Sequence, residues 1–322
     1  MEFDFGKIVD FSLFKWAKEE GIWKYFLALL VFTAVISFST YYMMGTLLSP
    51  FSALQDQSVT EAINAIFHFF TFIFFIIIVS VVFGAAFNYL LIAMALRAKG
   101  KKFVDFGAKR WLGIIVLGIL NFFAALFSVF KLKLLVVGIV GLVLTGISVI
   151  LIVMSGIGGN WGIAVLALLF FLLGLILLMV YLIIVVYNCL RLSFSSIVFI
   201  EKELGFVESM HKSWEMTHGK VLNILVALIL IGLIAAVISL IGSFPLSVYN
   251  FVAGISSGGM IGITNLFNPL FLILNIPALV TSTIGAIISA FGLVAIYEQL
   301  QVNTISLTKP KKLIAKRRAT KK

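Results

Sequence analysis

The sequence predicts an all-α, polytopic membrane protein, and three observations carry this prediction. Of the 322 residues, 62% are hydrophobic and 11% are charged. Several uncharged runs reach the roughly 20 residues that a helix needs to cross the hydrocarbon core of a bilayer. FTFIFFIIIVSVVFGAAF (Phe70 to Phe87) lacks the apolar–polar alternation of a barrel strand. We therefore expect spanning helices and no membrane β-barrel.

Seven apolar runs follow one another along the chain, and basic residues lie in three of the six gaps between them. The runs lie at about 23–48, 62–96, 111–130, 134–154, 162–200, 221–242 and 269–302. Positively charged flanks favour the cytoplasmic side of a membrane. The 24 Lys and Arg residues form four large groups (four residues up to Lys24, six at 97–110, four at 191–220 and eight at 309–322) and the pair Lys131 and Lys133. We expect the four large groups, and with them both termini, on the cytoplasmic side of the cell membrane.

The N-terminal sequence MEFDFG is acidic and has none of the features of a cleaved signal peptide, so the first run is expected to remain as an anchor. The connections at 49–61 and 243–268 contain no Lys or Arg and are expected on the outside.

Placing the large basic groups on one side requires an even number of crossings between neighbouring groups. Residues 111–190 contain three runs, so one of them should not cross. We expect this to be 134–154, which carries Gly138, Gly141 and Gly146, because glycine-rich backbone is typical of re-entrant segments. The expected fold has six spanning helices plus one partial or re-entrant segment. The alternative is seven full crossings with one misplaced basic group.

Three similar octapeptides suggest an internal repeat. VDFSLFKW (9–16), VDFGAKRW (104–111) and VESMHKSW (207–214) each place an acid directly after Val and Trp seven residues after Val. The Val and Trp of each octapeptide, with an apolar residue between them, form a one-sided apolar stripe on a helix. Such a helix lies in the membrane interface, where Trp is enriched. Trp16, Trp111 and Trp214 are therefore the expected interfacial anchors.

The repeat hypothesis divides the chain into one membrane domain and a tail. The membrane domain covers 1–308 and contains three pseudo-repeats, each an interfacial helix followed by a transmembrane hairpin. The pseudo-repeats are expected at 1–100, 101–204 and 205–308, and the basic cytoplasmic tail at 309–322.

A second pattern, aromatic–polar–any–Leu, recurs near the end of each returning helix. It reads FNYL at 87–90, YNCL at 187–190 and YEQL at 297–300. Polar groups inside a helix bundle often mark pathways or sites, so Asn88, Asn188 and Glu298 form the candidate polar site. They are expected to face the bundle interior, with Leu90, Leu190 and Leu300 pointing away. The bland alternative is that the three side chains bond neighbouring helices or interfacial water.

The segment RLSFSSIVFIEKELGFVESMHKSWEMTHGK, Arg191 to Lys220, resembles a superfamily of prokaryotic, especially archaeal, membrane proteins. That group includes the membrane domain of some glycerophosphodiester phosphodiesterases. The matching residues are Gly205, Ser213, Trp214 and Gly219, and the similarity is most specific over about 185–240. The resemblance implies about six helices and no assigned chemistry. The phosphodiesterase domain itself has no counterpart in this sequence.

The sequence contains no convincing catalytic, metal-binding or cofactor-binding set. His211 and His218 lie two helical turns apart, about 10.5 Å, which is too far for simple chelation, and Cys189 is the only cysteine. We expect neither enzyme activity nor a cofactor. The expected partners are membrane lipids, with anionic headgroups attracted by the basic tail 309–322, and no nucleic acid.

Two functions from different classes fit these expectations. The first is a non-enzymatic membrane scaffold that interacts with lipids or with a partner protein. The alternative is a small transporter or channel that uses the candidate polar site. The low density of ionisable residues within the apolar runs favours the scaffold.

Overall fold

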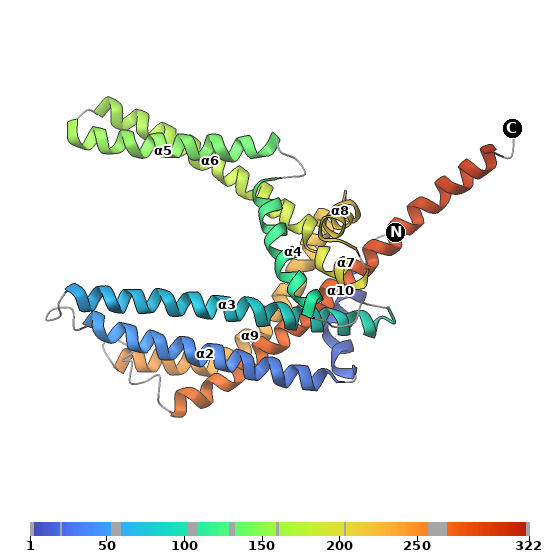
Figure 1. Ribbon diagram of the computed structural model, residues 1–322, viewed down its shortest axis with the longest axis horizontal. Helices are drawn as coiled ribbons and strands as arrows, with labels where there is room; N and C mark the ends of the chain where they lie inside the picture. Colours follow the sequence, from blue (N-terminus) through green and yellow to red (C-terminus); the bar gives the residue numbers. More distant parts are fainter. Residues whose placement is uncertain are drawn as a thin grey trace. The chain divides into compact units, whose positions relative to one another are not determined.

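The computed structural model is helical throughout the part of the chain that it describes (Figure 1). Most of the described residues are helical, and none lies in a strand. The described residues are 3–19, 21–52, 59–101, 108–128, 133–158, 161–202, 204–256 and 269–319. Six helices are long and apolar enough to cross a membrane, which confirms the predicted helical, multi-pass class.

Short helices precede each pair of long ones in chain order. The N-terminal run contains α1 (Phe5–Asp10), the π-helix η1 (Phe11–Lys15) and the 3₁₀ helix η2 (Trp16–Lys18). The long helices are α2 (Ile22–Ser52), α3 (Val59–Ala98), α5 (Leu135–Gly158), α6 (Trp161–Leu192), α9 (Val221–Ser256) and α10 (Pro269–Ala319). The other short helices are α4 (Ala108–Leu126), α7 (Ser195–Glu201) and α8 (Phe206–Met216). The threefold equivalence of these groups stays a prediction.

The chain divides into two compact units, which interleave along the sequence. The first contains Met1–Ile115, Ile200–Glu203 and Leu225–Lys322, and the second contains Val116–Phe199 and Leu204–Ile224. This division does not follow the boundaries of the three predicted pseudo-repeats.

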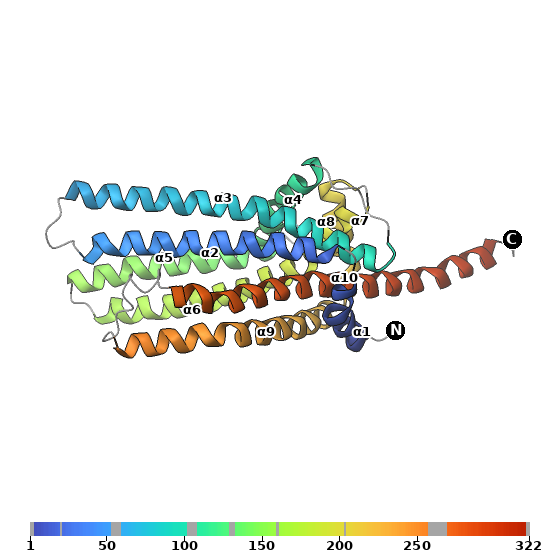
Figure 2. The ribbon, with the colours of Figure 1, turned by 90° about the horizontal axis from the view of Figure 1, so that it is seen from below.

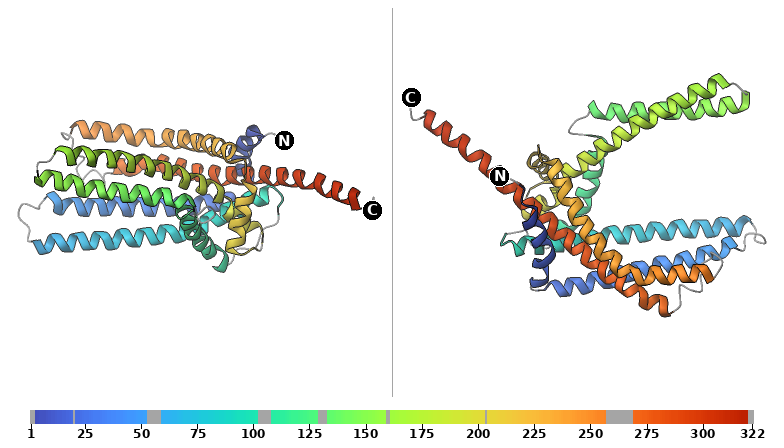
Figure 3. Two further views of the ribbon diagram at one scale, coloured as in Figure 1. Left: turned by 90° about the horizontal axis from the view of Figure 1, so that it is seen from above. Right: turned by 180° about the vertical axis from the view of Figure 1, so that it is seen from behind.

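Helix α10 is the centre of the first unit. It contacts the N-terminal run, α2 and α3, and α9 runs beside it (Figure 3). The closest approach to α9 occurs at glycines, since a Cβ on Gly292 would lie 2.4 Å from the Ile231 side chain. The buried apolar residues of α10 include Ile287, Phe291 and Leu300. The core of this unit therefore lies along the middle of α10, at residues 287–300.

The second unit is built on the α5–α6 hairpin (Figure 2). Glycines on both helices allow the close contact. A Cβ on Gly138 would lie 2.8 Å from the Tyr181 ring, and a Cβ on Gly174 would lie 2.5 Å from Thr145 Oγ1. Small residues at such crossings let two helix backbones approach closely within a membrane.

The prediction that 134–154 does not cross is wrong. Helix α5 is continuous over Leu135–Gly158 and contains a 22-residue candidate span. Gly138 and Gly141 face α6 and do not interrupt the helix. The short apolar helix is instead Arg110–Leu126. The seven apolar runs thus correspond to six long helices and one short helix, and the short helix is α4.

Side chains of α6 end α4. Tyr181 donates a hydrogen bond from its hydroxyl to the carbonyl oxygen of Leu126. Asn188 donates to the carbonyl oxygen of Ala125 at 3.2 Å. Ser128 follows with a φ of 49°, which a helix cannot adopt. Carbonyl groups at a helix end lack the next turn of the helix as a partner, and these side chains bind two of them, in addition to the bond from the Ser128 N–H to the Ala125 carbonyl oxygen at 3.3 Å. The apolar run 111–130 thus stops short of a full span.

The close contact between α5 and α6 predicts that a glycine in this hairpin can be replaced by alanine without loss of stability only where no neighbouring atom occupies the space of the new Cβ. In Gly174→Ala, the new Cβ must displace the Thr145 backbone and side chain, so we expect a loss of about 1–3 kcal/mol in unfolding free energy. Gly146→Ala is the matched control, because no atom lies within 4 Å of its Cβ position. Thermal unfolding of both variants in one detergent measures the difference. Equal unfolding temperatures would contradict the described helix contact.

Candidate functional site

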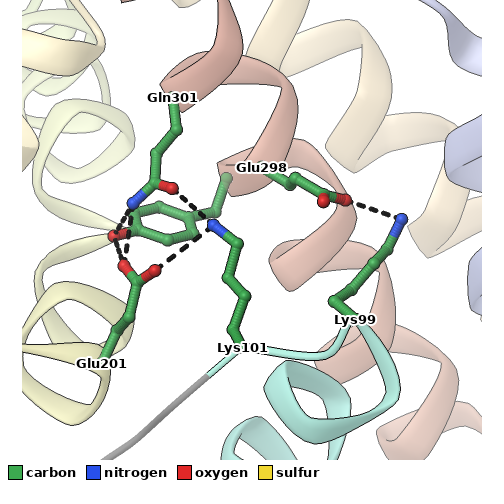
Figure 4. Close-up of polar contacts among 6 residues, drawn as sticks. Lys99, Lys101, Glu201, Glu298 and Gln301 are labelled. Carbon is green, nitrogen blue, oxygen red and sulfur yellow. Dashed lines mark hydrogen bonds and ion pairs between the residues drawn. The ribbon is translucent and has the colours of Figure 1, made fainter. Parts of the chain in front are cut away.

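Six polar side chains of the first unit meet near the end of the apolar part of α10 (Figure 4). We call this cluster the polar hub. Its residues come from three places in the chain: 99–101 directly after α3, the last residue of α7, and 297–301 on α10. Its members are Lys99, Lys101, Glu201, Tyr297, Glu298 and Gln301.

Glu201 accepts hydrogen bonds from three partners. Lys101 Nζ lies 3.2 Å from Glu201 Oε1, and Gln301 Nε2 donates to Glu201 Oε2 at 2.8 Å. The Tyr297 hydroxyl donates to the same Oε2. The Glu201 side chain is only 13% exposed, and a carboxylate is stable at such a position when it is paired and hydrogen-bonded.

Lys101 closes the network. Its ammonium group also donates to the side-chain oxygen of Gln301, and it lies 5.3 Å from the centroid of the Tyr297 ring. Gln301 Nε2 donates in turn to the Tyr297 hydroxyl oxygen at 2.6 Å. The four side chains therefore satisfy one another, and the contacts hold the end of α7, the end of α3 and α10 together.

Glu298 forms a separate ion pair in the hub. Lys99 Nζ lies 2.7 Å from Glu298 Oε2 and 4.1 Å from the centroid of the Phe11 ring. Phe11 opens the π-helix η1 and its ring centroid lies 5.5 Å from that of Phe291. A cation over an aromatic face adds to the attraction of the carboxylate. The pair thus joins α3, α10 and the N-terminal run.

The neighbouring Gln299 binds the backbone of the N-terminal run. Its Oε1 accepts from the Asp4 N–H at 3.0 Å, and its Nε2 donates to the Asp4 carbonyl oxygen at 2.8 Å. The Asp4 side chain caps α1 by accepting from the Lys7 N–H. This hydrogen bond, together with the Lys7 ammonium, lowers the pKa of the Asp4 carboxyl below its usual value. The first helix is therefore fixed to α10 in a single register.

In the second unit, Arg191 connects α6 to α8. The residue is 2% exposed, and its guanidinium carbon lies 3.7 Å from the centroid of the Trp214 ring. It donates to the carbonyl oxygen of Trp214 and to Thr217 Oγ1. Ser213 Oγ donates back to the Arg191 carbonyl oxygen at 2.7 Å. A planar guanidinium both stacks on a ring and donates several hydrogen bonds, so it holds α8 firmly.

These contacts give structural roles to the residues of the predicted Gly–Ser–Trp–Gly pattern. Gly205 precedes α8, and its N–H donates to Glu208 Oε2 at 3.3 Å. Ser213 and Trp214 contact Arg191. Gly219 has a φ of 73°, which permits the turn into α9. The pattern is thus explained by the way in which α8 is attached.

The three candidate polar residues have different surroundings. Asn88 is exposed, and its expected position in the bundle interior stays a prediction. Asn188 is buried, as expected of an interior residue, and donates to Ala125 and to Ser128 Oγ, the latter at 3.0 Å. Glu298 is partly exposed in its pair with Lys99. Leu300, which was expected to point towards lipid or another helix, is completely buried. Asn88 and Glu298 belong to the first unit and Asn188 to the second.

The three expected anchors also differ. Trp214 lies on the separate amphipathic helix α8, as predicted. Trp16 is buried in η2. Trp111 lies inside α4, which continues into the following apolar run, and residues 102–107 of the expected helix are outside the described residues. Their common depth and threefold relation stay predictions.

The histidines carry little chemistry. His211 Nε2 lies 3.2 Å from Glu215 Oε1 on the exposed face of α8, and His218 is exposed. The side chain of His68 lies outside the described residues. Within the described part of the chain, no group of three or more His, Cys, Asp or Glu side chains could hold a metal ion.

Sequence reasoning missed most of the polar hub. Only Glu298 was a candidate, whereas Lys99, Lys101, Glu201 and Gln301 were not. One local signal existed, because Tyr297 and Gln301 are four residues apart and share a helix face. Their partners lie about 100 and 200 residues away in the sequence, and no local pattern reveals such pairs.

Searches against protein-family models, curated proteins and solved structures gave no match to this chain.

The network around Glu201 predicts a specific loss of stability. Glu201→Gln removes the only carboxylate that contacts Lys101 among the described residues, so we expect a loss of about 2 kcal/mol in unfolding free energy. The control is Glu215→Gln on α8, where the exposed pairs should contribute under about 1 kcal/mol. Thermal unfolding in one detergent compares the two variants. A larger effect at position 215 would contradict the structural role of the hub.

Proposed function

We propose that this protein is a non-enzymatic membrane scaffold whose cytoplasmic face engages anionic lipid headgroups. The observation that carries the proposal is the position of the basic residues on the six long helices. Basic residues lie at the start of α2, directly before α5 and α9, and at the end of α3, α6 and α10. The connections at the opposite ends, 53–58, 159–160 and 257–268, contain no Lys or Arg.

The short helix α4 removes the parity conflict in the sequence. If α4 does not cross, two crossings separate each basic group from the next, because α2 with α3, α5 with α6 and α9 with α10 act as three hairpins. Lys131 and Lys133, between α4 and α5, then join the other basic residues. All 24 Lys and Arg residues fall on one side, which the positive-inside rule assigns to the cytoplasm. Both termini lie there in this topology.

Polar contacts at this face favour a scaffold over a transporter. In the polar hub, lysines, carboxylates and amides are paired with one another, so the described contacts serve packing. Asn188 uses its amide donors to end α4, and Glu298 is paired with Lys99. Because Asn88 is exposed, the candidate polar site does not form one enclosed set within the first unit. We therefore do not propose transport.

The basic end of α10 is a second contribution to lipid binding. The helix continues to Ala319, so the backbone of 309–319 is helical. Eight Lys and Arg residues lie in 309–322 with no acidic residue. Each basic residue held near an anionic surface contributes roughly 1 kcal/mol of attraction. Membrane lipids are thus the proposed partners.

This proposal predicts a preference for anionic lipid. Reconstitution into nanodiscs of phosphatidylcholine with increasing phosphatidylglycerol should raise the thermal unfolding temperature stepwise. Added salt should weaken the effect, because exposed charges are screened within about 10 Å at 0.1 M ionic strength. Removal of 309–322 should reduce it without abolishing it, because sixteen basic residues remain. An unfolding temperature that is independent of lipid charge would contradict the proposed function.

A further inference from the structure

The N-terminal run joins α2 through a sharp turn that is open on its outer side. We call residues 15–24 the elbow. Gly21 makes the turn with a φ of 83°, which side-chain-bearing residues rarely adopt. A Cβ at this position would meet no atom within 4 Å. The turn therefore leaves space beside the backbone at the point where the first candidate span, Ile22–Thr40, begins.

One face of α2 is directed towards lipid. Trp23, Leu27, Val31 and Val35 follow one another at intervals of four residues, and each is more than half exposed. Residues with this spacing share a helix face, so acyl chains contact this stripe in a membrane. Trp23 is its first member, at the end of the span, and its ring is suited to headgroup depth.

Three exposed lysines surround this end of the stripe. Lys15, Lys18 and Lys24 are exposed, and none of them is paired with an acidic side chain among the described residues. The neighbouring Glu19 is directed to Arg97, with 3.6 Å between its Oε1 and the arginine Nε. Glu20 lies outside the described residues. The elbow thus has more positive than negative charge available to a ligand.

A buried donor in the elbow has no acceptor. Trp16 is 8% exposed, and its indole Nε1 makes no hydrogen bond. Its ring centroid lies 6.0 Å from that of Trp23, which places the donor beside the start of the lipid-facing stripe. A buried N–H without an acceptor is unfavourable, and a phosphate oxygen is a strong acceptor.

We propose that the elbow binds the phosphate of an anionic phospholipid whose acyl chain lies along the Trp23–Val35 stripe of α2. The proposal rests on the lipid-binding function above and names its site. Lys18 and Lys24 supply charge from the two sides of the turn, and the open space at Gly21 admits the phosphate. The Trp16 N–H donates to a phosphate oxygen after a small side-chain movement. The apolar stripe selects a lipid over a free phosphate ion.

Native mass spectrometry of the full chain in detergent, with phosphatidylglycerol titrated against phosphatidylcholine, tests this site. The variant is Lys18→Gln/Lys24→Gln, and the matched control is Lys133→Gln/Lys212→Gln, which removes the same charge outside the elbow. Each lysine near an anionic group contributes about fivefold in affinity, so the elbow variant should lose roughly 25-fold and the control under about twofold.

Trp16→Phe separates the indole donor from the ring. Because the N–H has no hydrogen-bond partner among the described residues, its loss should lower the affinity for phosphatidylglycerol severalfold. The smaller ring should lower the unfolding temperature in lipid-free detergent only modestly. If Trp16→Phe and the native chain had equal affinity for phosphatidylglycerol, the indole N–H would not be part of the binding site.

Three further outcomes decide the proposal. Equal losses in the elbow and control variants would overturn the site and leave the proposed function standing, because attraction would then be diffuse. No preference of the native chain for phosphatidylglycerol would overturn both. Competition by inorganic phosphate as effective as that by the lipid would overturn the role of the apolar stripe and identify a simple anion site.

Discussion

The constraint on which the proposed topology depends is that positive charge stays out of the hydrocarbon and on one side of it. A Lys or Arg at the bilayer centre is costly, and of the 24 in the chain only Lys24 and Arg191 lie inside the seven apolar runs. Keeping them together requires three hairpins and therefore an even number of crossings. Helix α4 is where the chain meets this requirement, because Tyr181 and Asn188 end it by binding its last carbonyl groups.

Within the first unit, residues 297–301 of α10 bind the ends of α3 and α7 and the N-terminal run. Tyr297 and Gln301 contact Glu201, Glu298 contacts Lys99, and Gln299 contacts Asp4. Successive side chains on an α-helix point about 100° apart. Five consecutive residues can therefore bind three other segments of the chain at once. Lysines that would repel one another are held close by carboxylates from α7 and α10.

The sequence predicted the helical membrane class and the number of long helices, since both depend on run length and charge. It failed to identify which run is short. Gly138 and Gly141 are typical both of a re-entrant segment and of close helix packing. Only their contacts with Tyr181 and Leu178, some 40 residues away in the sequence, identify close packing. Glu298 was a candidate from the sequence, but its partner Lys99 lies 199 residues earlier in the chain. No local sequence pattern indicated that Arg191 would be buried against α8.

The central claim is that α4 does not cross and that all basic residues share one face. Cysteine accessibility tests it most directly. In a Cys189→Ser background, Lys102→Cys reports the connection before α4, and Lys133→Cys reports the connection between α4 and α5. Both native lysines lie outside the candidate spans. A membrane-impermeant maleimide is applied to sealed vesicles of a single, known orientation. The account predicts that positions 102 and 133 are labelled from the same side. Labelling from opposite sides would show that α4 spans the membrane and would contradict the account.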